Sequence, residues 1–244
     1  MTINRSIWIG YDPREHAAAL VCERSLIATA AGELPPIRRL ELKALRDAGI
    51  YHREEYTRDG QRYDARDDSP FSTDFSFSRF LVPALELYAH GFALFMDSDF
   101  LWCDDVAGVF AQADPRYAVQ VVKHDFAPEP GRKMRGALQQ PYPRKNWSSL
   151  ILWNCDHPSN RKLTGGVVSM AAGRFLHGFG WLADDEIGDL DPRWNVLEGI
   201  DPQCAITAAG AIHYTRGTPD MPGYENAAHA RRWYAFAQIQ DPLL

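Results

Sequence analysis

The chain has 244 residues, enough for one sizeable α/β domain, with the 45% apolar and 24% charged residues of an ordinary globular protein. Its net charge of −6 argues against an electrostatic nucleic-acid binder, which needs a basic surface. The four cysteines form no CxxC pair, so we expect reduced thiols and no cluster of soft metal ligands. No apolar run approaches the ~20 residues of a membrane-spanning helix, and the N-terminus lacks a signal-peptide core, so we expect a cytoplasmic protein.

The N-terminal part of the sequence predicts a β-α-β unit. Ser6–Ile9 form a short apolar run closed by Gly10, which is typical of a buried strand. The segment Asp12–Glu15 resembles a helix start, with a capping acid, a proline at the first position and a glutamate three residues after the cap. A helix is expected over residues 17–31, and a half-exposed strand over residues 37–42.

The middle of the chain contains the best candidate for a central strand, the apolar run Phe92–Met96. Before it, the charged segment Tyr51–Ser69 has little periodicity and is expected to be an exposed excursion. The spacing of apolar residues over 74–90 predicts a helix, although Pro83 lies inside it. With further strands expected at 117–122 and 149–153, the chain 1–244 is predicted to be one α/β domain with a mostly parallel sheet covered by helices on both faces.

The triplet Asp97-Ser98-Asp99 directly follows the central strand. Open α/β sheets bind their ligands at this carboxyl edge. On an extended backbone two alternate side chains point the same way, so Asp97 and Asp99 can converge on one cation, with Ser98 facing elsewhere or bonding to a ligand. Carboxylate oxygens suit Mg²⁺ or Mn²⁺. A polar turn would also account for these three residues.

A second fragment, His213–Pro219, follows an apolar stretch, so His213 is also expected at a strand end. A neutral imidazole is a suitable third ligand for Mn²⁺. Arg216 and Gly217 offer a cation and a backbone that can approach phosphate closely. An ordinary surface histidine in a turn is the alternative.

Four segments, in this order and spacing, resemble the retaining glycosyltransferases of the glycogenin and lipopolysaccharide-galactosyltransferase family, which have the GT-A fold. They are Gly10-Tyr11-Asp12, Ser78-Arg79-Phe80-Leu81-Val82-Pro83, Phe95-Met96-Asp97-Ser98-Asp99 and the late His213-x-x-x-Gly217. The resemblance runs from Ile7 to about Tyr224. It implies a single GT-A-like domain that transfers a sugar from a nucleotide-diphosphate sugar, expected to be a UDP-hexose, to a saccharide or other hydroxyl acceptor.

The resemblance also implies roles for individual residues. The base of the donor would be held by Tyr11 and Asp12, and Arg79 would face the donor. The ligands of Mn²⁺ (or Mg²⁺) would be Asp97, Asp99 and His213. The donor diphosphate would lie on Gly217. The chemistry of their own side chains, and not the resemblance, makes Ser98 and Arg216 further candidate donor contacts.

The sequence departs from the family pattern in three places. The usual Asn-x-Gly motif is replaced by Asn146-Trp147-Ser148-Ser149, the usual Asp-Gln pair by Asp184-Asp185-Glu186, and the lysine of the usual tail is missing after Gly217. Asp185 is our candidate for stabilising positive charge on the sugar. Acceptor contacts are expected within residues 51–70 and 123–147, with Asn146 and Trp147 as the candidate residues.

Two other functions fit parts of the pattern. A phosphohydrolase of the haloacid-dehalogenase type also places a DxD triplet after an apolar strand, but usually near the N-terminus. A catalytically lapsed protein that binds sugar nucleotides would explain the altered motifs, although it would have no need for intact metal ligands.

Overall fold

A computed structural model describes residues 4–125, 131–132, 138–139, 144 and 146–238 of the chain. A six-stranded sheet lies at its centre, with the strand order β12-β8-β11-β6-β1-β2. Only β11 runs antiparallel to its neighbours, and the other adjacent strands are parallel. The predicted mostly parallel sheet is therefore confirmed, with strands β1 (Asn4–Tyr11), β2 (Ile37–Glu41), β6 (Gly91–Met96), β8 (Val119–Val121), β11 (Leu150–Asn154) and β12 (Ile187–Asp189).

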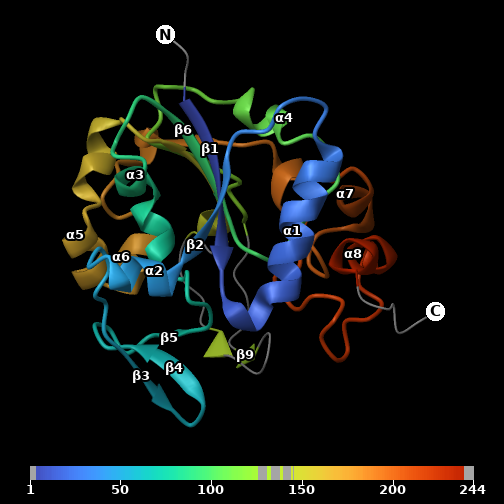
Figure 1. Cartoon of the computed structure of the whole chain (residues 1–244), viewed down its shortest axis with the longest axis horizontal. Helices are drawn as coiled ribbons and strands as arrows, with labels where there is room; N and C mark the ends of the chain where they lie inside the picture. Colours follow the sequence, from blue (N-terminus) through green and yellow to red (C-terminus); the bar gives the residue numbers. More distant parts are fainter. Residues whose placement is uncertain (1–3, 126–130, 133–137, 140–143, 145, 239–244) are drawn as a thin grey trace.

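Helices cover both faces of this sheet (Figure 1). One face carries α1 (His16–Thr29), α4 (Ala107–Phe110), α7 (Gln203–Thr207) and α8 (Ala230–Ala237). The other carries α2 (Leu42–Asp47), α3 (Val82–Leu85), α5 (Gly165–Met170) and α6 (Gly173–His177). Single 3₁₀ turns connect these elements: η1 (Pro13–Glu15), η2 (Ser78–Leu81), η4 (Trp147–Ser149), η5 (Pro158–Lys162), η6 (Asp184–Glu186) and η7 (Pro192–Asn195).

The alternation of side chains along each strand divides the core in two. On β1, Ile7 and Ile9 pack in the cluster under α1, while Trp8 packs in the cluster on the opposite face. On β6, Leu94 belongs to the first cluster and Phe95 to the second. Strands buried on both faces are expected to be continuously apolar, which is why the sequence showed them so clearly.

A second, three-stranded sheet positions the C-terminal third of the chain. Its strands are β7 (Phe100–Trp102), β14 (Ala211–His213) and β13 (Val196–Leu197), with β14 between the other two. β7 begins directly after the acidic triplet, and β14 pairs with it so that His213 lies opposite Phe100. The expected strand end at His213 is confirmed, and the pairing brings it beside Asp99.

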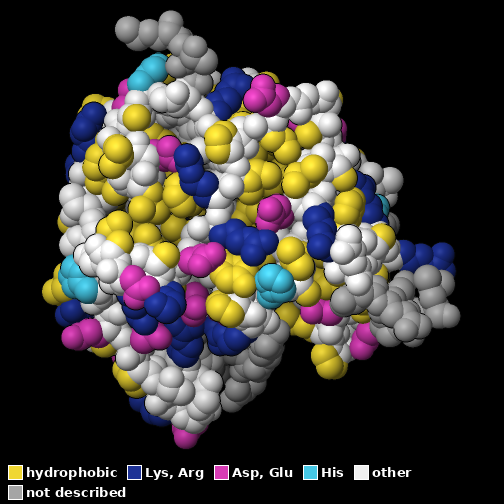
Figure 2. Space-filling view, in the orientation of Figure 1, with side chains coloured by type: hydrophobic (Ala, Val, Ile, Leu, Met, Phe, Trp, Pro, Cys, Tyr) yellow, Lys and Arg dark blue, Asp and Glu magenta, His cyan; other side chains and the backbone are white. Residues whose placement is uncertain are grey.

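The segment 51–69, expected as an exposed excursion, contains most of a small antiparallel sheet, whose first strand is exposed throughout. β3 (Glu55–Arg58) and β4 (Gln61–Asp64) form a hairpin that continues to β5 (Pro70–Phe71). Its two-residue turn is Asp59-Gly60, both with positive φ (51° and 75°), the conformation that Asp-Gly favours. Figure 2 shows Lys or Arg and Asp or Glu side chains interleaved on the surface over α2 and towards this hairpin.

The helix predicted over 74–90 is largely absent, because only η2 and the four-residue α3 form there. Pro83 lies in the first turn of α3, where its missing N–H removes no helical hydrogen bond. Leu87 and Tyr88 then have positive φ and end the helical segment.

The predicted acceptor loop 123–147 lies mostly outside the described residues. Within it, β9 (Gly131–Arg132) pairs antiparallel with β10 (Leu138–Gln139). In the part of the chain that the structure describes, the helices are too short or too polar for any of them to cross a bilayer.

Candidate metal centre

The acidic triplet lies where β6 ends, near the middle of the central sheet. Ser98 and Asp99 form a turn, and β7 starts at Phe100. The two carboxylates therefore converge through a turn, and not along an extended backbone as the sequence suggested. Ligand atoms of Asp97, Asp99 and His213 all lie within 4.8 Å of one another.

His213 is held in one orientation within this cluster. Its side chain is 2% exposed, and its ring stacks on Phe100 with centroids 4.6 Å apart and planes 16° apart. Nε2 lies 3.4 Å from Oδ1 of Asp99, and Nδ1 lies 3.0 Å from Oδ1 of Asn195. Asn195 was not among the predicted site residues, because only the pairing of β13 with β14 reveals that it is close.

Arg79 places a buried positive charge against the cluster. Its Nη1 donates to Oδ1 of Asp97 (2.6 Å) and to the carbonyl oxygen of Ser148 (2.8 Å), while Nε donates to the carbonyl of Ser76. The guanidinium thus offsets part of the negative charge of Asp97. Arg79 belongs to η2, and this turn places its side chain beside the site, as expected.

A third carboxyl group faces the triplet from the start of α1. The Ser98 hydroxyl is fully buried and donates to Oε2 of Glu15 (2.9 Å). Burial, and after it the charge of Asp99, raise the pKa of Glu15 to about 7. The sequence pattern presented Glu15 only as part of a helix start, so its place in the site was missed.

These residues fit a divalent cation. Two carboxylates and one imidazole supply hard oxygen ligands and one borderline nitrogen, a combination found for Mn²⁺ and related ions. Besides burial, which is the main cause, the negative charge of Asp99 raises the pKa of Glu15, and a cation bound here would offset that charge.

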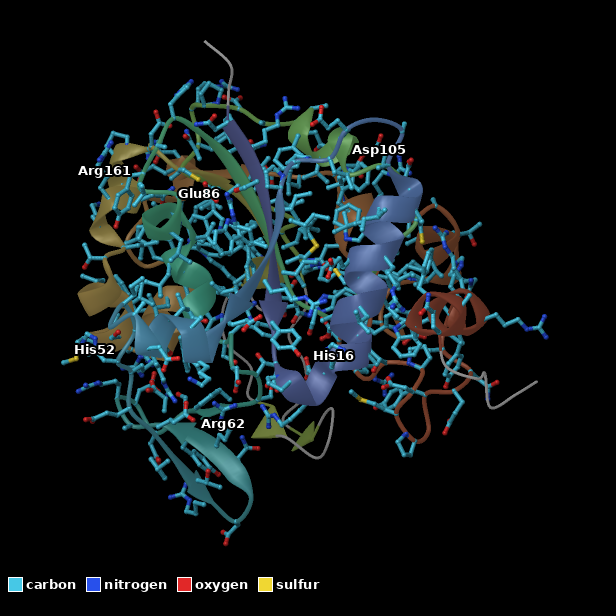
Figure 3. The ribbon with its side chains drawn as sticks, in the orientation of Figure 1. His16, His52, Arg62, Glu86, Asp105 and Arg161 are labelled. Carbon is cyan, nitrogen blue, oxygen red and sulfur yellow. The ribbon has the colours of Figure 1, made fainter. Side chains whose placement is uncertain are left out.

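The predicted donor contacts Tyr11 and Asp12 lie at the end of β1. The Tyr11 hydroxyl pairs with Nδ1 of His16 (3.0 Å), which Figure 3 shows at the lower end of α1, where β1 ends. Asp12 is buried and accepts hydrogen bonds from the backbone N–H and guanidinium of Arg14 and from the backbone N–H of Asp74. Its carboxylate therefore secures the start of η1 as well as lying near the site.

Arg216 and Gly217 follow β14 in a loop. Arg216 is exposed and donates to the carbonyl of Gly199 (3.2 Å). Gly217 is buried, and a Cβ there would lie 2.6 Å from the ring of Tyr224. The missing side chain at Gly217 thus makes room for this ring.

Asp185 does not lie with the cluster. It is exposed in η6, before β12, and the backbone N–H of Ala118 donates to the carbonyl of Glu186 at the edge where β8 begins. Asp97 lies at the opposite edge, where β6 ends. The position of Asp185 therefore does not fit its expected role of stabilising positive charge on the sugar. The acidic residue at the other end of β12 is Asp189, whose Oδ1 lies 3.1 Å from Nζ of Lys123.

The two predicted acceptor residues lie in the turn before β11. Asn146 is buried with a left-handed backbone (φ 64°), and its carbonyl accepts from the Ser149 hydroxyl. Trp147 is half-buried and donates from Nε1 to the carbonyl of His124 (3.0 Å). Burial, together with the charge of His213, lowers the pKa of His124 to about 4, so this imidazole is neutral at physiological pH.

Protein CDI of Arabidopsis thaliana is 41% identical to the chain over 232 residues, which cover 93% of the chain and 83% of that protein. The chain belongs to the CDI family. No protein-family model matches it.

Solved structures with the same fold are glycosyltransferases. The bifunctional enzyme WbbM matches with a TM-score of 0.65 at 12% identity, GlyE of Streptococcus pneumoniae with 0.59 at 11%, and the galactosyltransferase LgtC with 0.55 at 12%. The match covers 97%, 99% and 96% of the chain, respectively. The chain spans half of WbbM and 62% of GlyE, but 95% of LgtC. At such low identity the similarity establishes the fold, and the predicted GT-A-like domain is confirmed.

Proposed function

We propose that the chain is a glycosyltransferase that binds a nucleotide-diphosphate sugar, expected to be a UDP-hexose, with Mn²⁺ or Mg²⁺ at Asp97, Asp99 and His213. The observation that carries this proposal is the convergence of these three side chains within 4.8 Å at the edge of a sheet with the GT-A fold. Open α/β sheets bind ligands at this edge. The sugar would pass to a saccharide or other hydroxyl acceptor with retention of configuration.

A divalent cation at this site would stabilise the negative charge that develops on the leaving diphosphate. The protein's part is to hold the ligands and exclude water. Arg79 pairs with Asp97, and the turn through Ser98 is fixed by Glu15. Tyr11, Asp12, Arg216 and Gly217 remain the proposed contacts to the rest of the donor.

The acceptor is proposed to bind beside Asn146 and Trp147. Nδ2 of Asn146 is buried and has no hydrogen-bond partner among the described residues, so it can donate to a sugar hydroxyl. In a reaction in which the acceptor attacks from the face of the leaving group, positioning of this kind contributes more than a protein nucleophile.

The deciding experiment measures UDP release from a panel of UDP-hexoses with and without Mn²⁺, for the wild-type chain and Asp97→Asn. We expect metal-dependent donor cleavage that Asp97→Asn abolishes. The matched control is Asp105→Asn, since among the described residues the Asp105 carboxylate accepts hydrogen bonds from two backbone N–H groups near the far end of α1 (Figure 3). Turnover by Asp97→Asn near the wild-type rate would refute the proposal.

The same assays separate the other functions. A lapsed sugar-nucleotide-binding protein would bind the donor with Mn²⁺ and release no UDP. A phosphohydrolase would release phosphate from simple phosphomonoesters; the glycosyltransferase fold does not favour this alternative.

A further inference from the structure

A chain of three hydrogen bonds leads from the turn before β11 to His213. The Ser149 hydroxyl donates its hydrogen to the carbonyl of Asn146 (2.7 Å), so its oxygen is left to accept. Nδ2 of Asn195 donates to that oxygen (2.9 Å). Oδ1 of Asn195 consequently faces Nδ1 of His213 (3.0 Å). Every bond in the chain has only one consistent direction.

This direction fixes where the hydrogen of the His213 ring lies. An amide oxygen can only accept, so Nδ1 of His213 carries the hydrogen. In the neutral ring the lone pair is then on Nε2, the nitrogen that lies 3.4 Å from Oδ1 of Asp99. A lone pair on Nε2 is what a metal-binding histidine needs.

The imidazole ring of His213 is restricted in its rotation. Stacking on Phe100 holds its plane, and burial shields the network from water, since Asn195 is 0% and Ser149 4% exposed. A flipped ring would leave the amide oxygen of Asn195 facing a C–H group, without a partner in a buried place.

We propose that Asn195 is a positioning residue that presents Nε2 of His213 to the cation, and that Ser149 keeps the Asn195 amide in the required orientation. This inference rests on the proposed metal site. Ser149 also accepts from the backbone N–H of Asp97 (2.9 Å) through its carbonyl, so one residue supports ligands from both sheets. Ser149 belongs to the segment that replaces the Asn-x-Gly motif. In this segment its hydroxyl would orient the Asn195 amide.

The test compares Mn²⁺ affinity of the full chain, measured by electron paramagnetic resonance of free Mn²⁺ at fixed pH, among variants of this network. Asn195→Leu keeps the branched shape of the side chain and removes the acceptor, and we expect it to weaken binding about 10–100-fold. Asn195→Asp retains an acceptor for Nδ1 but loses the donor to Ser149, so its affinity should fall between those of wild type and Asn195→Leu. Ser149→Ala, which removes only the hydroxyl, should weaken binding by an intermediate factor.

The matched control is Asn154→Leu. Like Asn195, Asn154 is buried, and its Nδ2 donates to two carbonyl oxygens. It is the last residue of β11, at the end of this strand opposite to Ser149. We expect its Mn²⁺ affinity to equal that of wild type. An equal loss in Asn154→Leu and Asn195→Leu, or unchanged affinity in Asn195→Leu, would overturn the inference.

A second measurement does not depend on the metal. ¹⁵N NMR of histidine-labelled, metal-free protein reports which ring nitrogen carries the hydrogen, and we expect Nδ1 for His213 in wild type and a change in Asn195→Leu. A hydrogen on Nε2 in wild type would overturn the role of Asn195. Failure of the wild-type chain to bind Mn²⁺ would instead refute the proposed metal site, and the two results are thereby distinguished.

Discussion

Replacing Glu15 by Gln should stabilise the metal-free protein at alkaline pH. Burial and the charge of Asp99 raise the pKa of Glu15 from 4.5 to about 7. The folded state therefore binds this proton more tightly than the unfolded chain does. The resulting contribution to stability is complete below pH 4.5 and is lost as the pH rises through about 7. Gln imitates the protonated carboxyl, and its side-chain oxygen can still accept from the Ser98 hydroxyl.

The size of the effect follows from the displacement of this pKa. At about 1.4 kcal/mol per pH unit, the full displacement corresponds to about 3 kcal/mol at pH 8. Glu15 is partly exposed to solvent. Solvent screening therefore reduces the expected gain in stability to about 1–3 kcal/mol. For a domain of this size this is a rise in Tm of about 3–10 °C.

The assay is thermal unfolding with a chelator present, for both proteins at pH 5 and pH 8. Most of the difference should develop between these two values. The control is Glu186→Gln, because the Ser159 hydroxyl lowers the pKa of Glu186 and its ionised form adds stability above pH 4.5. Glu186→Gln should therefore destabilise the protein at pH 8. A Glu15→Gln variant that is no more stable than wild type at pH 8 would refute the reasoning that burial and the charge of Asp99 disfavour the ionised form of Glu15.

Three further predictions address the site and the core. Mn²⁺ at 100 times its Kd should stabilise the wild-type chain by about 2.7 kcal/mol in scanning fluorimetry, and Asp99→Asn should lose this shift; a full shift in the variant would contradict the ligand set. The side chains of Arg53 and Asp64 form an ion pair and are 2% and 0% exposed. Arg53→Met removes the cation of this pair and should lower the free energy of unfolding, measured in urea, by about 3–5 kcal/mol. A decrease below about 1 kcal/mol would count against a buried pair. Gly10→Ala places a Cβ 2.5 Å from the ring of Phe75 and should cost about 1–3 kcal/mol, part of which Phe75→Leu in the same chain should restore.

The features that the sequence predicted well are local ones. The central strand and the triplet after it could be found because burial on both faces leaves a continuous apolar run that ends at Met96. His213 was placed correctly for the same reason, at the end of β14. The hairpin turn Asp59-Gly60 had a clear local signal that the prediction overlooked.

The features that were missed depend on pairing between distant segments. Asn195 lies beside His213 only because β13 pairs with β14, and neither strand is long enough to be marked by periodicity. Asp185 was misplaced because an acidic stretch does not reveal at which end of its strand it lies. The parallel pairing of β12 with β8 determines the position of Asp185, which lies at the edge of the sheet opposite to Asp97.

The position of His213 on the second sheet has a consequence for folding. Asp97 and His213 are more than one hundred residues apart in the sequence; Asp97 directly follows β6 of the central sheet, and His213 ends β14 of the second sheet. A cation bound by both would act as a reversible cross-link that closes a very long loop, the case in which a cross-link restricts the unfolded chain most. Docking of β13 and β14 against β7 would then vary with the concentration of the free ion, and hydrogen exchange in these strands should slow as the cation is added.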